Sequence, residues 1–275
     1  MSKTTAKIVV WILPVLMALV WIVPYIYMLL ASFKSDIDMM LGGFTLNNLT
    51  LETYIDVLGN TTVAPIGTWF LNSIIVSVSA CVMYAVVALL AAYGYSRLKF
   101  RGRDLLFMLL MLSMTIPGII NIVPQYQIMT SLNLKNNLLA VILPSVGGMS
   151  GLFLMKQFMM RLPRSLDEAA ELDGAGRITI LFQILLPQVI PALVIVMLFC
   201  FLGVWNDFLW PSVILDDYRS STLTSGFYIL TGVYDAEQAS LMAASIVSSL
   251  PIIAIYLVFQ KYLFQGISIS SGIKE

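Results

Sequence analysis

The chain has 275 residues, of which 59% are hydrophobic and only 11% are charged, and its 15 basic and 15 acidic side chains leave no net charge. A soluble fold of this size needs a largely polar outer shell, with about 25% charged residues, so the composition excludes an ordinary soluble protein and indicates one embedded in a bilayer. The neutral charge gives no reason to expect a nucleic acid partner, and the absence of histidine removes the commonest metal ligand and general base.

Six apolar stretches are long enough to cross about 30 Å of hydrocarbon, which takes roughly 20 helical residues. Because these stretches are continuous rather than alternating, they predict an all-α membrane protein, which we expect to form a single domain over residues 1–275. The first stretch is longer than the apolar core of a signal peptide, so it is expected to remain as a span. In chain order, the predicted spans cover residues 8–33, 70–95, 105–123, 138–155, 189–209 and 241–264.

Prolines occur inside several of these stretches. In a bundle, neighbouring helices can bond the carbonyl groups that a proline frees, so each proline is expected to kink its span rather than end it. These prolines include Pro14, Pro24, Pro117 and Pro144.

The distribution of basic residues predicts the orientation. With the N-terminus inside, twelve of the 15 lysine and arginine residues fall in the inner segments, and only Lys34, Lys135 and Arg219 fall outside. This asymmetry satisfies the positive-inside rule. We therefore expect a multi-pass protein of the cytoplasmic membrane with both termini in the cytoplasm.

The sequence lacks the groups that would let the chain drive transport by itself. No G-x-x-x-x-G-K-[ST] motif occurs to hold a nucleotide phosphate. Asp207 is the one acid near a span, so a proton relay of buried carboxylates is not indicated. The two cysteines, Cys81 and Cys200, lie in apolar runs and are interpreted as packing residues. No cofactor is expected in this chain, and it is not expected to be an enzyme.

The inner loop over residues 156–188 concentrates charge in a chain that is otherwise poor in it. Ser165 and Glu168 fit a capping box at the start of a short helix, and Gly174 permits the tight or left-handed backbone that would end it. A second short helix is expected from about Arg177 to Leu186, before Pro187. The two helices would form a projecting element.

One face of the first loop helix carries small residues. Leu166, Ala169, Ala170 and Asp173 share it, at spacings of three and four. An alanine face allows close docking in a groove of another protein. The alternative is an amphipathic helix lying on lipid, but such helices prefer basic and large apolar residues. Acids and alanines dominate here, which favours docking.

These residues resemble the E-A-A-x3-G-x9-I-x-L-P loop of the membrane subunits of binding-protein-dependent ABC importers. Asp173-Gly174-Ala175 is similar to the sugar-importer version of that loop. Three further segments resemble the second permease of maltose-type carbohydrate importers, namely Trp69 to Ser73, Trp205 to Phe208, and Gln260 to Tyr262 with Gly266. The loop positions that match are Glu168, Ala169, Ala170, Gly174, Ile184, Leu186 and Pro187.

The resemblance implies a six-span type I permease bundle whose inner loop contains a coupling helix. It further implies a homologous partner permease in a heterodimer, two cytoplasmic ATPases that bind ATP and magnesium, and an extracellular solute-binding protein that delivers a sugar. In such importers the coupling helix sits in a cleft of the ATPase. The residues expected to take part are Glu168, Ala169, Ala170, Asp173, Gly174, Ala175, Ile184, Leu186 and Pro187.

Two outer regions are candidates for contact with the solute or its carrier. Trp205, Asn206 and Asp207 could bind sugar by ring stacking and hydroxyl contacts. The favoured interpretation is instead that Trp205 and Trp210 form an outer aromatic belt and that Asp207 reaches outer water. In the resembled family, the segment around Gly226, Phe227 and Tyr228 can reach into the binding protein. An ordinary surface or re-entrant loop explains this segment equally well.

The function expected from these features is ATP-driven import of a sugar or oligosaccharide. A permease for another small polar solute, such as glycerol phosphate or an amino acid, is the nearest alternative. An ion-coupled secondary transporter would need buried carboxylates that the sequence lacks, and a scaffold protein would leave the loop signature unexplained.

Overall fold

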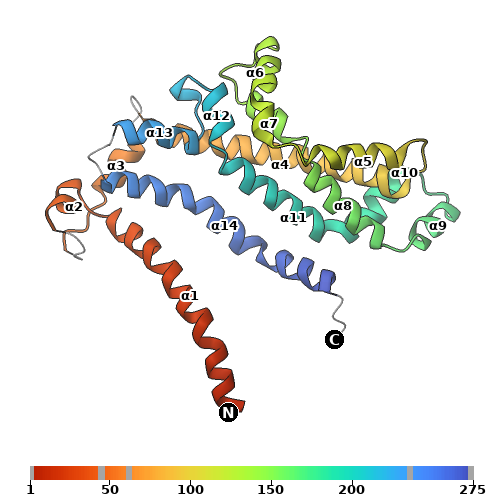
Figure 1. The fold of residues 1–275 in the computed structure, drawn as a ribbon, viewed down its shortest axis with the longest axis horizontal. Helices are drawn as coiled ribbons and strands as arrows, with labels where there is room; N and C mark the ends of the chain where they lie inside the picture. Colours follow the sequence, from red (N-terminus) through yellow and green to blue (C-terminus); the bar gives the residue numbers. More distant parts are fainter. Residues whose placement is uncertain (1–2, 43–46, 60–63, 234–237, 272–275) are drawn as a thin grey trace. The chain divides into compact units, whose positions relative to one another are not determined.

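The computed structural model describes residues 3–42, 47–59, 64–233 and 238–271. Within these ranges the chain is helical and contains no strand, which confirms the prediction of an all-α protein (Figure 1). The α-helices are α1 (Lys3–Ala31), α2 (Asp36–Gly42), α3 (Glu52–Gly59), α4 (Ile66–Arg97), α5 (Arg103–Ser113), α6 (Ile122–Ser131), α7 (Leu139–Ser145), α8 (Met149–Arg161), α9 (Ser165–Leu172), α10 (Arg177–Thr179), α11 (Leu186–Trp205), α12 (Leu209–Ile214), α13 (Leu223–Val233) and α14 (Gln238–Ser271). The 3-10 helices η1 (Gly118–Asn121) and η3 (Tyr218–Ser220) and the π-helix η2 (Ile180–Leu185) complete the set.

Four of the described helical runs are long and apolar enough to cross a bilayer without a break. They lie in α1, α4, the continuous run from α10 to α11, and α14. Two further candidates are helix pairs bent at a short break, by 94° between α5 and the η1–α6 run and by 41° between α7 and α8. If each bent pair is one span, the described residues contain the six spans that the sequence predicts.

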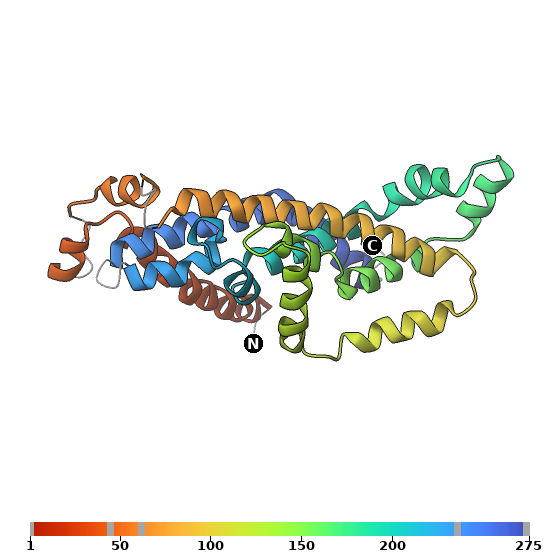
Figure 2. The ribbon, with the colours of Figure 1, turned by 90° about the horizontal axis from the view of Figure 1, so that it is seen from above.

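The third predicted span, over residues 105–123, is not one kinked helix. Helix α5 ends at Ser113, and the chain turns at Pro117, whose ψ of 126° is far from helical. A proline disfavours the helical conformation of the residue before it, so Pro117 interrupts the span. Figure 2 shows the resulting change of direction between α5 and α6.

The fifth predicted span, over residues 189–209, is wrong at both ends. The helix begins at Arg177 and ends at Trp205. The second loop helix therefore begins at Arg177 as expected, but the predicted end before Pro187 is wrong, because the helix continues into α11. In the π-helix η2, the N–H of Leu186 bonds the carbonyl of Leu181, five residues back. After this wider turn, Pro187 falls in the first turn of α11. A residue at that position needs no N–H for the hydrogen bonds of the α-helix, so the helix continues through the proline.

The chain divides into two compact units, and the predicted single domain stays a prediction. The first comprises residues 1–69 and 226–251, and the second comprises residues 70–225 and 252–275. In the first unit, the Tyr25 hydroxyl and Ser249 Oγ lie 2.9 Å apart, and the N–H of Ala239 donates to Asp36 Oδ1 at 2.7 Å. Asp36 thus places a carboxylate at the start of α14, where the exposed backbone N–H groups favour an anion.

The second unit has its core where α4, α8, η2 and α11 meet. Tyr84 of α4 lies in this core, and its hydroxyl accepts the backbone N–H of Gly151 at 2.7 Å. A Cβ atom at Gly148 or Gly151 would overlap the Tyr84 side chain. Two glycines one turn apart therefore let α8 approach α4 closely, as small residues do between membrane helices.

Gly151→Ala should destabilise this helix contact. The added methyl group meets the Tyr84 ring, and overpacking of this kind costs about 1–3 kcal/mol. The measurement is thermal unfolding of the purified protein in detergent, with Gly94→Ala as the control, because no atom lies within 4 Å of a Cβ at Gly94. Equal melting temperatures for the two variants would contradict the close approach of α8 to α4.

Candidate functional site

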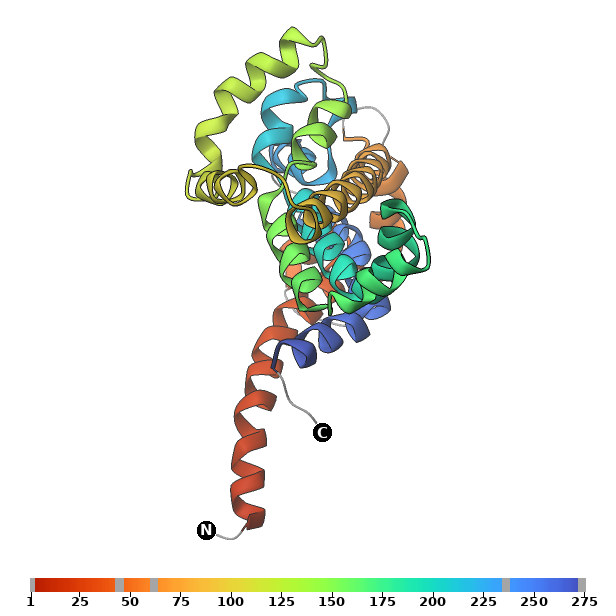
Figure 3. The same ribbon diagram turned by 90° about the vertical axis from the view of Figure 1, so that its right-hand side faces the viewer.

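Helix α9 lies in the predicted inner loop, at the end of the second unit that faces the viewer in Figure 3. The predicted capping box at Ser165 is wrong, because the helix begins at Ser165 itself and no side chain caps it. The backbone N–H groups of Asp167 and Glu168 instead donate to the Arg164 carbonyl, at 3.0 and 3.1 Å. The first turn therefore satisfies these donors from its own backbone.

The predicted turn at Gly174 is confirmed. Gly174 has a φ of +83°, and its N–H donates to the Glu171 carbonyl at 3.0 Å. The N–H of Ala175 donates to the Ala170 carbonyl at 2.9 Å. Together these bonds form a Schellman motif, which ends α9 sharply and requires a left-handed residue at Gly174.

The loop residues of the sequence signature divide into two groups. Ala170 is buried at 6% exposure, and Ala175, Ile184 and Leu186 pack against the same core of the second unit. The remaining signature residues are exposed, namely Glu168, Ala169, Asp173, Gly174 and Pro187. The signature thus combines residues that hold α9 on the bundle with residues that are open to a partner.

The predicted docking face of small apolar residues is only partly present, because Ala170 faces the core. The most exposed large apolar side chains on and beside α9 are Leu172, at 90%, and Ile178, at 77%, and Leu166 is exposed at 37%. Leu172 lies between Glu171 and Asp173, and Ile178 is the second residue of the helix that begins at Arg177. Sequence reasoning missed them, although a leucine that falls off the Leu166–Ala170 face of a charged helix is a usable signal.

A buried ion pair joins α9 to α4. Arg97 Nη1 lies 3.2 Å from Asp167 Oδ2, and Arg97 Nη2 donates to the Leu162 carbonyl at 3.1 Å. Beside the pair is a cavity of about 340 Å³ with a strongly charged lining. Its lining residues are Tyr93, Arg97, Leu98, Lys99, Arg164, Asp167, Glu168, Glu171, Arg177 and Ile180.

The three residues predicted for the solute path have different surroundings. Trp205 is buried at 2% exposure, stacked on Phe201 with ring centroids 5.4 Å apart and edge-on to Phe70 at 5.9 Å. Its ring is therefore a core element, and the expected place of Trp205 in an outer aromatic belt is wrong. Asn206 is exposed, and its side-chain amide donates to the Leu202 carbonyl at 2.8 Å.

Asp207 lies beyond the end of the fifth span, at a second polar cavity of about 310 Å³. Gln125, Ser145 and Trp210 share this cavity with it, among apolar residues of η1, α6, α7 and α12. Burial raises the pKa of the Asp207 carboxyl, and hydrogen bonds from the backbone N–H groups of Trp210 and Leu209 oppose the shift. The cavity offers a carboxylate, an amide and a hydroxyl, which are groups that bind hydroxylated solutes.

The segment predicted to contact a binding protein is a helix rather than a loop. Gly226 and Phe227 lie in α13, and Gly226 is buried so close to Trp69 that a Cβ atom there would overlap the indole. Gly226 is therefore a packing residue. The Tyr228 side chain lies outside the described residues.

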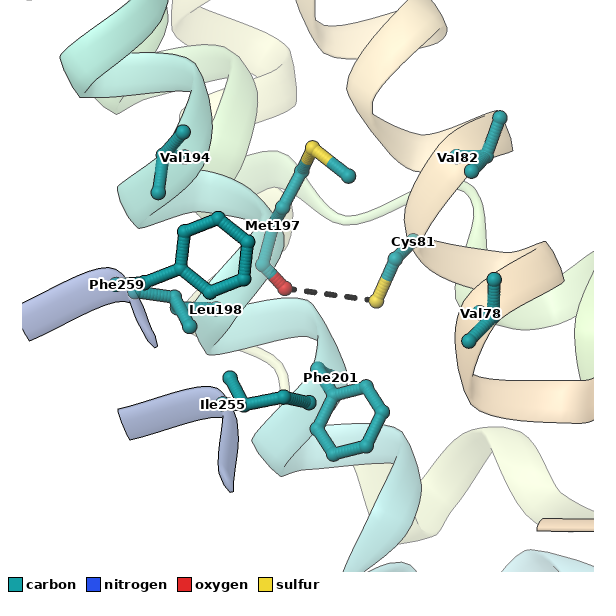
Figure 4. A pocket seen from close by; sticks show the side chains of 9 residues that line it. All are labelled: Val78, Cys81, Val82, Val194, Met197, Leu198, Phe201, Ile255 and Phe259. Atoms are coloured by element: carbon teal, nitrogen blue, oxygen red, sulfur yellow. Dashed lines mark hydrogen bonds between the residues drawn. The ribbon is translucent and has the colours of Figure 1, made fainter. Parts of the chain in front are cut away.

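A third cavity, of about 200 Å³, has an entirely apolar lining from α4, α11 and α14 (Figure 4). Cys81 lines it, with Sγ 3.4 Å from the Met197 carbonyl oxygen. Both cysteines are free, and Cys81 is buried, as expected of a packing residue. A cavity with this lining offers no partner to a polar solute. Its residues are Val78, Cys81, Val82, Val194, Met197, Leu198, Phe201, Ile255 and Phe259.

Known proteins are similar to this chain in sequence, and one solved structure is similar to it in fold. The family described as binding-protein-dependent transport system inner membrane component matches residues 84–269. An arabinooligosaccharide transport system permease of Halalkalibacterium halodurans is 31% identical over 281 residues, covering 100% of both chains. A diacetylchitobiose uptake system permease of Streptomyces coelicolor is 34% identical over 259 residues, covering 92% of this chain and 85% of that protein.

A solved structure supports the same fold. One chain of a bacterial ABC transporter involved in the import of the acidic polysaccharide alginate superposes with a TM-score of 0.83. The two chains are 23% identical, and the match covers 95% of this chain and 97% of that one. The chain therefore belongs to the inner membrane component family of binding-protein-dependent transport systems, as a non-catalytic, multi-pass permease of the ABC importer type.

Proposed function

We propose that this chain is one of two membrane subunits of an ATP-driven importer that brings an oligosaccharide into the cytoplasm. Its partners are a homologous permease, two cytoplasmic ATPases that bind ATP and magnesium, and an extracellular solute-binding protein. Both termini, and α9 with them, face the cytoplasm. The excess of basic residues in the inner segments supports this orientation.

The single observation that carries the proposal is the exposed apolar surface at α9, a short helix that ends in a Schellman motif, on a chain whose sequence has no phosphate-binding loop. Leu172 and Ile178 are open to contact, and Ala169 and Glu168 beside them are exposed. Exposed apolar side chains rimmed by charges are typical of a protein interface. A membrane chain without its own nucleotide site needs such an interface to obtain energy from ATP.

Helix α9 is suited to act as the coupling element. When ATP binding closes the two ATPases, their clefts carry the docked helices together, and the membrane spans change from inward-facing to outward-facing. Such coupling requires contacts that differ between the two states. The Gly174 turn and the buried Ala170 attach α9 to the bundle, so a displacement of α9 acts on the helices that it contacts.

The chemistry of the Asp207 cavity supports a neutral hydroxylated solute. Asp207, Gln125 and Ser145 can exchange hydrogen bonds with sugar hydroxyls, and the described lining contains no lysine or arginine to bind a phosphate. A glycerol phosphate permease is therefore disfavoured at this cavity. The names of two relatives, which refer to arabinooligosaccharides and diacetylchitobiose, support the same solute class.

The proposal is tested by uptake in proteoliposomes that contain the assembled importer and its binding protein. Labelled arabinotriose and diacetylchitobiose represent the sugars, and glycerol 3-phosphate and glutamine represent the alternatives. We expect uptake of a sugar that stops when the ATPase is replaced by a variant unable to hydrolyse ATP. Uptake of only a non-sugar solute, or uptake by the chain without any ATPase, would overturn the proposal.

Leu172→Asp should weaken attachment of the ATPase. A charge in place of a central apolar contact costs at least about 1.4 kcal/mol, which corresponds to a tenfold loss of affinity. The measurement is the amount of ATPase that co-purifies with the membrane subunits. Leu132→Asp is the control, because Leu132 is also exposed but lies in the predicted outer segment. Equal recovery of the ATPase with both variants would argue against docking at Leu172.

Gly174→Val should separate ATP hydrolysis from sugar uptake. The positive φ disfavours valine by about 1–2 kcal/mol, although no atom lies within 4 Å of the added Cβ. Gly174→Asn is the matched control, since asparagine tolerates the left-handed conformation. We expect uptake per ATP to fall with valine and to be kept with asparagine, at normal membrane levels of both variants. Normal uptake by the valine variant would show that the turn is dispensable.

A further inference from the structure

Few interactions within the chain fix the position of α9. Of its eight residues, only Ala170 is buried. The turns on either side contain Pro163 and the left-handed Gly174, and their hydrogen bonds run within the loop backbone rather than to α4. Beyond the buried Ala170, the orientation of α9 relative to α4 therefore depends on polar contacts.

The guanidinium group of Arg97 supplies those contacts. Arg97 is the last residue of α4, and its side chain is only 6% exposed. Nη1 reaches Asp167 Oδ2 in the first turn of α9, and Nη2 reaches the Leu162 carbonyl at the end of α8. One side chain thus connects the end of α4 to both sides of the α8–α9 turn.

This ion pair is poorly arranged for stability alone. Arg97 Nε and Asp167 Oδ1 are buried and have no hydrogen-bond partner among the described residues. A buried pair recovers its desolvation penalty only when such atoms are satisfied, so replacing both charges together should leave stability nearly unchanged. The pair instead fixes the distance between the end of α4 and the first turn of α9, because the Arg97 guanidinium must stay near the Asp167 carboxylate.

The charged cavity beside the pair gives α9 room to move. Its volume of about 340 Å³ lies against α4, α9 and α10, and its side chains are mostly ionic. On this side of α9 the cavity separates it from α4, so the apolar contact of α9 with the core is confined to Ala170. The Arg97–Asp167 contact is then the element that obliges α4 to follow such a displacement.

We propose that the Arg97–Asp167 ion pair transmits displacement of α9 to α4, which makes Arg97 and Asp167 positioning residues for the coupling of ATP hydrolysis to solute movement. The inference rests on the proposed function, since it assumes that an ATPase moves α9. It assigns the transmission step to a specific contact between two helices of this chain. The nearby Arg103–Asp104 pair joins adjacent residues of one helix and cannot serve this role.

The decisive variant removes both charges, as Arg97→Gln together with Asp167→Asn. It leaves no unpaired buried charge, so the chain should assemble with its ATPase and unfold at the wild-type temperature. In proteoliposomes containing the whole importer, ATP hydrolysis should persist while uptake per ATP falls about tenfold, within the usual range of coupling free energies. The matched control is Arg103→Gln together with Asp104→Asn, whose ion pair is exposed at 82% on the aspartate side. The control should keep the wild-type value of solute uptake per ATP hydrolysed.

A reciprocal variant, Arg97→Asp with Asp167→Arg, should recover part of the uptake per ATP, because the ion pair can re-form with its charges exchanged. Unchanged uptake per ATP in the variant with Arg97→Gln and Asp167→Asn overturns the inference. Failure of that variant to assemble with the ATPase also overturns it, because the pair would then have only a structural role. The probe is whichever of arabinotriose or diacetylchitobiose the wild-type importer accumulates. If the wild-type importer accumulates neither sugar at the expense of ATP, the proposed function fails, whatever the variants do.

Discussion

The close approach of α8 to α4 is the contact on which the geometry of the site depends. Gly148 and Gly151 present bare backbone to Tyr84, and the Tyr84 hydroxyl accepts the Gly151 N–H. In hydrocarbon, such packing and hydrogen bonding between helices replace the hydrophobic effect as the source of association. Because α8 runs on into the turn before α9, its position against α4 brings the Leu162 carbonyl within reach of Arg97.

The loop signature serves two physical purposes at once. Ala170, Ala175, Ile184 and Leu186 bury small or apolar surface against the bundle, while Glu168, Ala169 and Asp173 remain exposed. The Schellman motif at Gly174 joins the two groups by ending α9 after two turns. A signature with this composition belongs to an element that must be attached on one side and accessible on the other.

Two cavities of the second unit differ in the polarity of their lining. The apolar cavity around Cys81 lies among α4, α11 and α14, and the Asp207 cavity lies beyond the end of α11. Trp205 is the last residue of α11, and its ring packs against Phe70 and Phe201. It does not line the Asp207 cavity. Of the Trp205–Asp207 segment, Asp207 is thus the residue that lines the polar cavity.

The bilayer environment, the helical class and the turn at Gly174 could all be predicted from the amino-acid sequence. Each follows from properties of the residues themselves, such as transfer free energy, backbone bonding in hydrocarbon and the φ range of glycine. The sequence also predicted the family through a loop of fixed spacing. Three features emerged from the folded chain alone: Ala170 faces the core, the helix continues through a π-turn into Pro187, and Arg97 contacts Asp167. The position of Ala170 and the Arg97–Asp167 contact depend on residues far apart in the chain, and the π-turn depends on the hydrogen-bond register of the whole helix, so local spacing encodes none of them.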